Sequence, residues 1–317
     1  MNKARPKPRQ ILLSKRANIF YLEHARVLQK DERIVWLTET GEDVEQYFNL
    51  PERNTALLLL GKGTSITDAA MRRLAESNVL VGFCGSGGSP LFAAAEPVFL
   101  TPQSEYRPTE YMQAWVRQWM DEARRLELAK ALIAERITLT GKAWARNSEL
   151  LQRKIELPAT AIDKLRQRSA AVPDTQALLL AEAEWARALY ASLSAGHGLN
   201  FTRQEGMGAK GSKEERINSF LDHGNYIAYG LAAVALNGLG ISYAFPLLHG
   251  KTRRGALVFD IADLIKDAYV MPLAFTCGAD LRVKDNAFRA LLIETLQDAD
   301  ALDFLFGFVK QLCEKPV

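Results

Sequence analysis

Three side chains near residue 250 have the types and spacing of a divalent-metal site. His249 lies at a turn marked by Gly250, and Asp260 and Asp263 follow at the start of an apolar-striped segment. Two aspartates three residues apart on a helix share one face, with Cβ atoms about 5–6 Å apart. Two carboxylates and an imidazole suit Mg²⁺ or Mn²⁺, which favour oxygen ligands and keep waters for a substrate phosphate. Taken alone, however, these aspartates are better explained as caps that stabilise a helix N-terminus.

Another acid, Glu182, is predicted to project from the apolar face of its helix. Leu178 lies one turn before it, and Trp185 lies on the turn after it. A lone carboxylate there would be costly, so Glu182 needs a partner inside the fold. A metal ion and a buried arginine explain the pattern equally well. Glu184, by contrast, shares its face with Arg187 and is expected to form an ordinary surface pair.

Basic residues gather in two places. The first 16 residues hold six lysines and arginines and no acid, and a solvated arm is the simplest explanation. The second group directly follows His249 and consists of Lys251, Arg253 and Arg254. The net charge of the chain is only +3, so overall charge does not by itself indicate a nucleic-acid binder. The position of the second group, beside the candidate ligands, makes it the more informative one.

Other motifs are weaker. Gly61–Ser65 resembles a phosphate loop superficially, but it lacks the glycine and lysine order that cradles phosphates. The chain has no G-x-S-x-G nucleophile motif, and its three separated cysteines form no CxxC pair. His223 is the rival of His249 as a metal ligand, although helix packing and capping better explain it and the neighbouring Asp222.

Composition limits the class of protein. Hydrophobic residues make up 48% and charged residues 24% of the chain, as in ordinary globular proteins. The longest apolar runs are far shorter than the roughly 20 residues that a membrane span needs. The residues before Ile11 lack the apolar core of a signal peptide. We therefore expect a soluble cytoplasmic protein with no membrane association.

The predicted secondary structure changes from mainly strand to mainly helix near residue 105. Short β-branched and aromatic runs, separated by turns about ten residues apart, indicate strands up to residue 84, with one helix near 67–77. A proline-punctuated linker over 101–108 follows. The remainder is predicted to be almost entirely helical, with expected segments over 109–141 and 142–156, another after Pro158, and further ones over 173–196, 220–236, 260–270 and 286–312. The expected fold class is α+β, with an N-terminal β-sandwich-like domain carrying one helix, followed by an all-α domain.

Several of these residues together resemble a known family. Glu182 is followed by Tyr190, Asn218 precedes an apolar helix, and His249 is followed at +11 and +14 by the two aspartates. This order is similar to that of the CRISPR spacer-acquisition integrase family, most of all its I-F subtype. Subtype-like stretches include Leu80–Gly85, Leu100–Tyr111, Phe220–Tyr226 and Leu248–Arg254.

The resemblance implies an architecture, a set of partners and residue roles. It implies a β-rich dimerisation domain over 1–104 and a helical catalytic domain over 105–317. The implied partners are a second copy of the chain, a small ferredoxin-like subunit fused to a helicase–nuclease, and double-stranded DNA, both as spacer precursor and as repeat array. The implied metal ligands are Glu182, His249 and Asp263, with Asp260 as a further catalytic acid. The implied phosphate contacts are Lys251, Arg253, Arg254 and Arg216.

The implied reaction is attack by a spacer 3′-hydroxyl on a phosphodiester, with Mg²⁺ or Mn²⁺ polarising the phosphate. With water as the nucleophile, the same site would be an endonuclease. Two alternatives remain. One is a non-catalytic DNA-binding scaffold in which the acids cap helices, and the other is a metal hydrolase of small phosphate esters.

Overall fold

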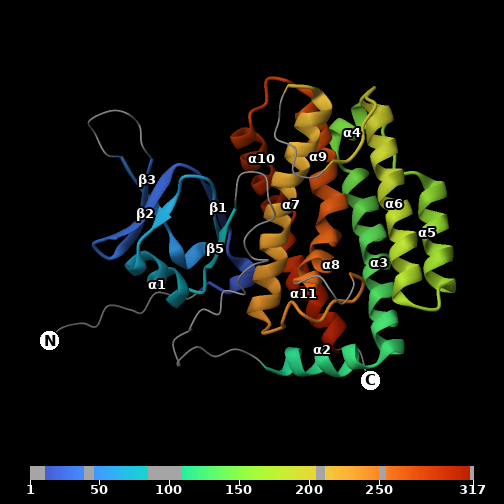
Figure 1. The fold of residues 1–317 in the computed structure, drawn as a ribbon, viewed down its shortest axis with the longest axis horizontal. Helices are drawn as coiled ribbons and strands as arrows, with labels where there is room; N and C mark the ends of the chain where they lie inside the picture. The colour runs from blue at the N-terminus through green and yellow to red at the C-terminus, as the bar shows by residue number, and fades with distance from the viewer. Residues whose placement is uncertain (1–10, 39–45, 85–108, 205–210, 250–254, 315–317) are drawn as a thin grey trace. The chain divides into compact units, whose positions relative to one another are not determined.

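The computed structural model describes residues 11–38, 46–84, 109–204, 211–249 and 255–314 (Figure 1). These residues fall into two compact units, the first ending at Phe83 and the second running from Cys84 onward. The boundary expected between residues 104 and 105 lies outside the described residues and stays a prediction.

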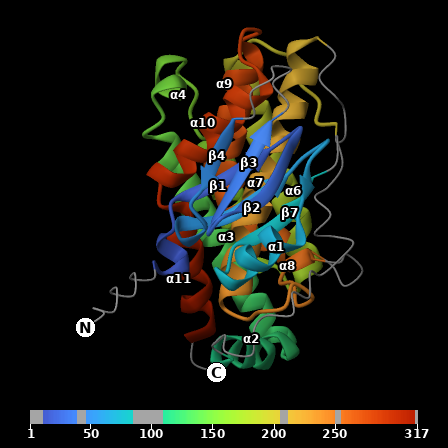
Figure 2. The same ribbon diagram turned by 90° about the vertical axis from the view of Figure 1, so that its left-hand side faces the viewer.

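The first unit is built from two sheets, whose strands Figure 2 shows. The three-stranded sheet is parallel and has the order β1 (Asn18–Leu22), β5 (Thr55–Leu60), β7 (Leu80–Phe83). The four-stranded sheet has the order β4 (Tyr47–Leu50), β3 (Arg33–Thr38), β2 (Ala25–Lys30), β6 (Ser65–Ile66). In it β2 and β4 pair antiparallel with β3, whereas β6 pairs parallel with β2. Short 3₁₀ turns, η1 (Leu13–Lys15) and η2 (Glu52–Asn54), precede β1 and β5.

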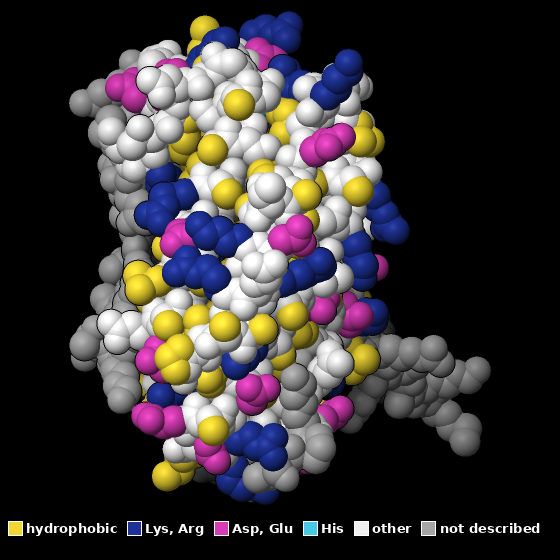
Figure 3. Space-filling view, turned by 90° about the vertical axis from the view of Figure 1, so that its right-hand side faces the viewer, with side chains coloured by type: hydrophobic (Ala, Val, Ile, Leu, Met, Phe, Trp, Pro, Cys, Tyr) yellow, Lys and Arg dark blue, Asp and Glu magenta, His cyan; other side chains and the backbone are white. Residues whose placement is uncertain are grey.

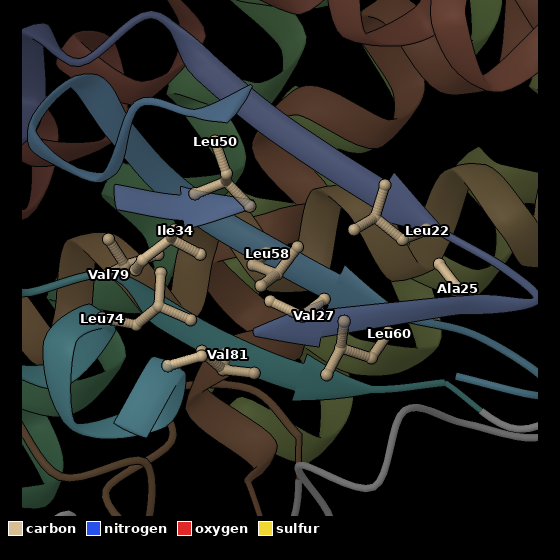
Figure 4. Close-up of a cluster of buried hydrophobic side chains, with 11 residues drawn as sticks. Leu22, Ala25, Val27, Ile34, Leu50, Leu58, Leu60, Leu74, Val79 and Val81 are labelled. Atoms are coloured by element: carbon tan, nitrogen blue, oxygen red, sulfur yellow. The ribbon is translucent and has the colours of Figure 1, made fainter. Parts of the chain in front are cut away.

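Side chains from both sheets meet in one hydrophobic core (Figure 4). Leu58 of β5 and Val27 of β2 have no exposed surface. The helix α1 (Asp68–Glu76) adds Leu74 to this core and begins where the Thr67 hydroxyl accepts the N–H of Ala70. Each fully buried aliphatic side chain of this kind contributes about 1.5–3 kcal/mol. The expected sandwich-like unit with one helix is confirmed.

Every regular element that the structure describes in the second unit is a helix, in agreement with the expected all-α domain. Its elements are α2 (Glu110–Met120), α3 (Glu122–Trp144), α4 (Ser148–Gln152), α5 (Ala159–Ala171), α6 (Thr175–Gly196), α7 (Lys213–Gly238), α8 (Ala256–Ile265), the π-helical turn η4 (Lys266–Val270), α9 (Met271–Ala279), α10 (Asp285–Asp298) and α11 (Ala301–Glu314). The long, largely buried α7 is contacted by α8, α9, α10 and α11. The helices α3, α5 and α6 pack against one another (Figure 1). None of the helices described is long and apolar enough to cross a membrane.

Several expected helix boundaries were wrong. The helix expected over 142–156 is reduced to α4, because α3 continues to Trp144, and the helix expected over 220–236 begins earlier, at Lys213. The helix expected over 109–141 is broken at Asp121, whose backbone is extended and whose carboxylate accepts the N–H groups of Ala123 and Arg124. The helix expected over 286–312 is broken at Asp300, which has a φ of 48°. The helix expected from residue 260 begins at Ala256, because Gly255 provides its N-cap. The last shift places Asp260 inside a helix rather than at its start.

The turn η4 joins α8 to α9 where the chain passes close to α7. Pro272 stands in the first turn of α9, directly after the π-helical turn. Further along α9, a Cβ added to Gly278 would lie 2.5 Å from Cγ1 and 3.0 Å from the backbone of Ile217 in α7. Only glycine therefore allows this approach of the two helices.

Candidate active site

Asp260 organises the segment that carries His249. Its fully buried carboxylate accepts the backbone N–H groups of Leu247 at 2.6 Å, Leu248 at 3.1 Å and His249 at 3.1 Å. The Nδ1 atom of His249 lies 2.6 Å from Asp260 Oδ1 and donates to it. Such a bond fixes the imidazole and directs Nε2 to the opposite side, as second-shell carboxylates do at metal sites. The capping explanation for Asp260 is wrong, and its contacts fit a positioning role.

Two tryptophans of α2 hold the same segment from the other side. The indole N–H of Trp115 donates to the carbonyl of Phe245 at 3.1 Å, and that of Trp119 donates to the carbonyl of Pro246 at 2.7 Å. The carbonyls of residues 245 and 246 and the amides of residues 247–249 therefore all have hydrogen-bond partners. Although His249 belongs to no helix or strand, its backbone is anchored by α2 and α8.

Arg136 of α3 lies at the centre of the cluster and holds three carboxylates. Its Nε and Nη2 atoms donate to Asp267 at 2.6 and 3.1 Å, which is a bidentate pair. Its Nη1 donates to Glu182 Oε1 at 2.7 Å and lies 3.5 Å from Asp263 Oδ2. Only 2% of its side chain is exposed. Burial opposes its charge, but the charges of Asp267, Glu182 and Asp263 outweigh that cost and raise the pKa of Arg136.

Asp267 and Asp263 have further partners. The indole N–H of Trp185 donates to Asp267 Oδ2 at 2.8 Å, and that of Trp144 donates to the Asp267 carbonyl at 2.9 Å. The ammonium of Lys266 donates to Asp263 Oδ1 at 2.7 Å. Burial would raise the pKa of Asp263, but the charges of Lys266 and Arg136 lower it overall. Asp263 is therefore ionised at neutral pH.

The structure brings Glu182, His249 and Asp263 into one neighbourhood from three separate segments. Glu182 and Asp263 both approach Arg136 Nη1. Burial acts to lower the pKa of His249, but its bond to Asp260 and the charges of Asp263 and Glu182 raise it overall. The buried arginine that we considered for Glu182 is present. Within the described part of the chain, no three His, Cys, Asp or Glu side chains are arranged to hold one metal ion directly.

The donor chemistry of this cluster nevertheless fits a divalent cation. Four carboxylates, those of Glu182, Asp260, Asp263 and Asp267, face two permanent cations, Arg136 and Lys266. An excess of two negative charges remains when His249 is neutral, and such an excess is costly in a buried place. Among the described residues, no hydrogen bond reaches Glu182 Oε2 or His249 Nε2. These two atoms could therefore act as ligands.

The remaining predicted residues lie elsewhere or outside the described ranges. Lys251, Arg253 and Arg254 belong to residues 250–254, which are not described. Arg216 donates to the carbonyls of Asp280, at 3.2 Å, and Val283, and stacks on Phe220 at 5.2 Å, so its guanidinium is engaged within the fold.

The rival histidine, His223, and its neighbour Asp222 lie well inside α7. They cannot cap that helix, so this part of their expected explanation was wrong. Asp222 pairs with Arg203, which lies ahead of α7 in the chain. A packing role within the unit is therefore supported for Asp222.

Sequence reasoning missed Arg136, Lys266 and Asp267. A signal existed for Arg136, because it follows Leu132 and precedes Thr140 on the buried face of α3. A buried arginine on an apolar stripe demands carboxylates, just as Glu182 demands a cation. Asp267 follows Asp263 by one helical turn and could have been added on the same ground.

The described part of the second unit also has two surface hollows. One of about 750 Å³ is lined by the starts of α3 and α6, and one of about 240 Å³ lies between α5 and α6. The face over α5 and α6 carries Lys and Arg with Asp and Glu among them (Figure 3). Its pairs of Glu184 with Lys164 and Arg168 offer a surface counterpart to the buried cluster.

Comparison with known proteins decides the family. The family described as CRISPR associated protein Cas1 matches residues 19–296. This chain belongs to the Cas1 family. The CRISPR-associated endonuclease Cas1 of Pseudomonas aeruginosa (strain UCBPP-PA14) is 44% identical over 315 residues, which cover 96% of this chain and 95% of that protein. The one from Pectobacterium atrosepticum is 42% identical over 316 residues, covering 96% and 94%. The crystal structure of a TtCas1–DNA complex has a TM-score of 0.69 at 26% identity, covering 95% of this chain and 93% of that one.

The family recognised from the motifs is therefore confirmed. The expected fold class is confirmed as well, because solved Cas1 structures share the arrangement of a strand-rich N-terminal and a helical C-terminal part.

Proposed function

We propose that this Cas1-family chain is a divalent-metal-dependent DNA integrase and endonuclease that inserts spacer DNA into a CRISPR array. The observation that carries the proposal is the approach of Glu182, Asp263 and His249 to one buried, negatively charged place. The names of the curated relatives, which are endonucleases, support the nuclease class. The TtCas1–DNA complex supports DNA as the macromolecule that is bound.

The contacts of these residues suggest a separate role for each. Glu182 through Oε2, His249 through Nε2 and Asp263 would hold Mg²⁺ or Mn²⁺. When bound, the ion would polarise a phosphodiester and offset the charge that develops on its oxygens. Asp260 would keep His249 in the tautomer that has a lone pair on Nε2, through the 2.6 Å contact at Nδ1. Asp260 is thus proposed as a positioning residue and not as a ligand.

The nucleophile would come from the substrate. A spacer 3′-hydroxyl attacks the phosphorus of a phosphodiester, so that a new P–O bond forms while the P–O bond to the displaced strand end breaks and that end leaves as a hydroxyl. A water in place of the 3′-hydroxyl gives hydrolysis, and neither route needs a covalent protein intermediate. Lys251, Arg253 and Arg254 follow the ligand His249 in the chain and would neutralise phosphates. Binding of this kind is salt-dependent and largely independent of sequence. We leave Arg216 out of this surface because backbone carbonyls already engage it.

The assembly that we propose contains more than this chain. It comprises a homodimer formed through residues 1–104, the small ferredoxin-like subunit fused to a helicase–nuclease, and spacer and repeat DNA in the cytoplasm. Light scattering on the purified chain should give twice the monomer mass of 35.3 kDa. A monomer at micromolar concentration would contradict the dimer without touching the proposed chemistry.

The decisive experiment is strand transfer of a short duplex into supercoiled plasmid with Mn²⁺, Mg²⁺ or EDTA. We expect Glu182→Gln, His249→Ala and Asp263→Asn each to lose at least about 100-fold in rate, the upper range for disturbing a metal site's supporting groups. Glu184→Gln is the matched control, because it removes a carboxylate two residues away that the α5 cations hold. Its rate should equal that of the wild type.

Transfer that persists in EDTA, or in the three variants, would contradict the proposal. DNA binding that survives EDTA, with no product from any variant or from the wild type, would instead favour the non-catalytic scaffold. Metal-dependent turnover of a chromogenic phosphodiester that DNA does not inhibit would favour the small-ester hydrolase.

A further inference from the structure

We infer that Arg136 is a built-in cation that balances the metal ligands in the metal-free protein and keeps their affinity for a divalent ion low. The inference rests on the proposed function, because it takes Glu182 and Asp263 as ligands. It deepens that function by naming a residue which touches neither metal nor DNA, yet controls how readily the site is filled.

The first step is that Arg136 cannot easily leave. Asp267 holds it by two hydrogen bonds, at 2.6 and 3.1 Å, and is itself held by the Trp185 indole at 2.8 Å. With Nε and Nη2 committed to Asp267, Nη1 is the nitrogen directed at Glu182, at 2.7 Å, and at Asp263, at 3.5 Å. The positive charge therefore stays beside both proposed ligands.

The second step concerns the charge balance. Buried carboxylates without a cation are strongly unfavourable, so Arg136 allows the ligand set to exist before a metal arrives. The same charge opposes an incoming divalent ion, because like charges a few ångströms apart repel strongly where water is excluded. Of the proposed ligands in the described structure, Lys266 pairs only with Asp263, at Oδ1. Arg136 is the cation that approaches both Glu182 and Asp263 in the described structure.

The test is a Mn²⁺ titration of the full-length protein without DNA, followed by thermal unfolding and by calorimetry. Arg136→Met removes the charge but keeps an unbranched side chain of similar length. We expect it to bind Mn²⁺ about tenfold more tightly than the wild type, which adds about 2–4 °C to the Mn²⁺-induced shift in midpoint. Arg168→Met is the matched control, since it removes a cation from Glu184, which lies on the same helix as Glu182. Its Mn²⁺ response should be that of the wild type.

Two further variants separate charge from packing. Arg136→Lys keeps a cation without the bidentate geometry, and its Mn²⁺ affinity should stay within about threefold of the wild type, well short of the tenfold change. Adding Glu182→Gln to Arg136→Met should abolish the extra Mn²⁺ shift, because a proposed ligand is lost. An extra shift that persists in the double variant would place the Mn²⁺ elsewhere and overturn the inference.

The outcomes decide the inference in both directions. An Arg136→Met protein that folds only when Mn²⁺ is present would support it strongly. Equal Mn²⁺ responses in Arg136→Met and the wild type would overturn it, and so would a variant that Mn²⁺ cannot refold. If wild-type strand transfer depends on Mn²⁺ while these responses are equal, this inference alone fails. If transfer needs no divalent ion, the proposed function fails with it.

Discussion

Two glutamates on α6 show how burial changes the meaning of the same contact. Glu182 lies 2.7 Å from Arg136, and their side chains are 12% and 2% exposed. Glu184 also lies 2.7 Å from a cation, Lys164, but these side chains are 33% and 63% exposed. The separation between charges is the same in both pairs. Water screens the second pair and is largely absent from the first, so only the buried pair is expected to matter for stability.

The exposed pair also corrects a detail of the sequence analysis. Glu184 was expected to pair with Arg187 on its own helix, but its partners are Lys164 and Arg168 of the neighbouring helix α5. Hydrogen bonds from Arg168 and Lys164 lower the pKa of Glu184 to about 2. The expectation that Glu184 is a surface residue holds, whereas its partners required knowledge of how α5 packs on α6.

The largest expected change in the free energy of unfolding comes from removing the buried cation, Arg136. Arg136→Met leaves Glu182, Asp263 and Asp267 without their common partner, and we expect it to lower the free energy of unfolding by about 3–5 kcal/mol in EDTA. Urea unfolding followed by circular dichroism measures the change. Arg168→Met removes an exposed partner of Glu184, which lies on α6 as Glu182 does, and it should leave the free energy of unfolding nearly unchanged. Equal losses in the two variants would remove the distinction between the pairs.

A middle-sized effect is expected from a neutral donor within the cluster. Trp185→Phe removes the N–H that bonds Asp267 Oδ2 at 2.8 Å and leaves a buried carboxylate short of a partner. We expect a loss of about 1–3 kcal/mol in the free energy of unfolding. Trp144→Phe removes a bond to the neutral carbonyl of the same residue, at 2.9 Å, and should cost about 0.5–1.5 kcal/mol. The reverse order would show that indole packing, and not the charge of Asp267, decides these losses.

The smallest effect is expected at Glu184. Because its pKa is lowered in the folded state, its contribution to stability is present above about pH 4.5 and is lost as the pH falls toward 2. An NMR titration of the side-chain carboxyl should place its midpoint below the usual range of a glutamate. Glu184→Gln should nevertheless unfold at the same urea concentration as the wild type at pH 7, and 0.5 M salt should erase any residual difference. A clear destabilisation at high salt would contradict the screening argument.

Much of the fold follows from local pattern. The runs that became β2, β3 and β5 were read from their β-branched and aliphatic residues, and Thr67 was at the predicted start of α1. The pairing of β1 with β5 in parallel was beyond such reasoning, because register depends on contacts between distant segments. The breaks at Asp121 and Asp300 were missed for a related reason. An aspartate inside a periodic segment is read as an exposed helical residue until its backbone is seen to leave the helix.

The residues of the candidate site were easier to predict from the sequence than the hydrogen bonds and ion pairs that connect them. Glu182 could be singled out because a carboxylate on an apolar face demands a partner, and the structure supplies one. The sequence could not choose between metal and arginine, since Arg136 lies 46 residues away on another helix. The role of Asp260 as the anchor of a backbone segment was hidden too, because the three amides that it binds precede it by 11 to 13 residues.

The continuous helical stretch of α8, η4 and α9 sets a limit on insertions and deletions in this part of the chain. Losing one residue from the regular turns of α8 would rotate everything after it by about 100° around the helix axis. Gly278 would then turn away from Ile217, and a bulkier neighbour would meet the α7 backbone at a point where even one methyl group has no room. The regular turns of this stretch thus act as a spacer of fixed length, and variation in chain length is better tolerated in the surface connections than here.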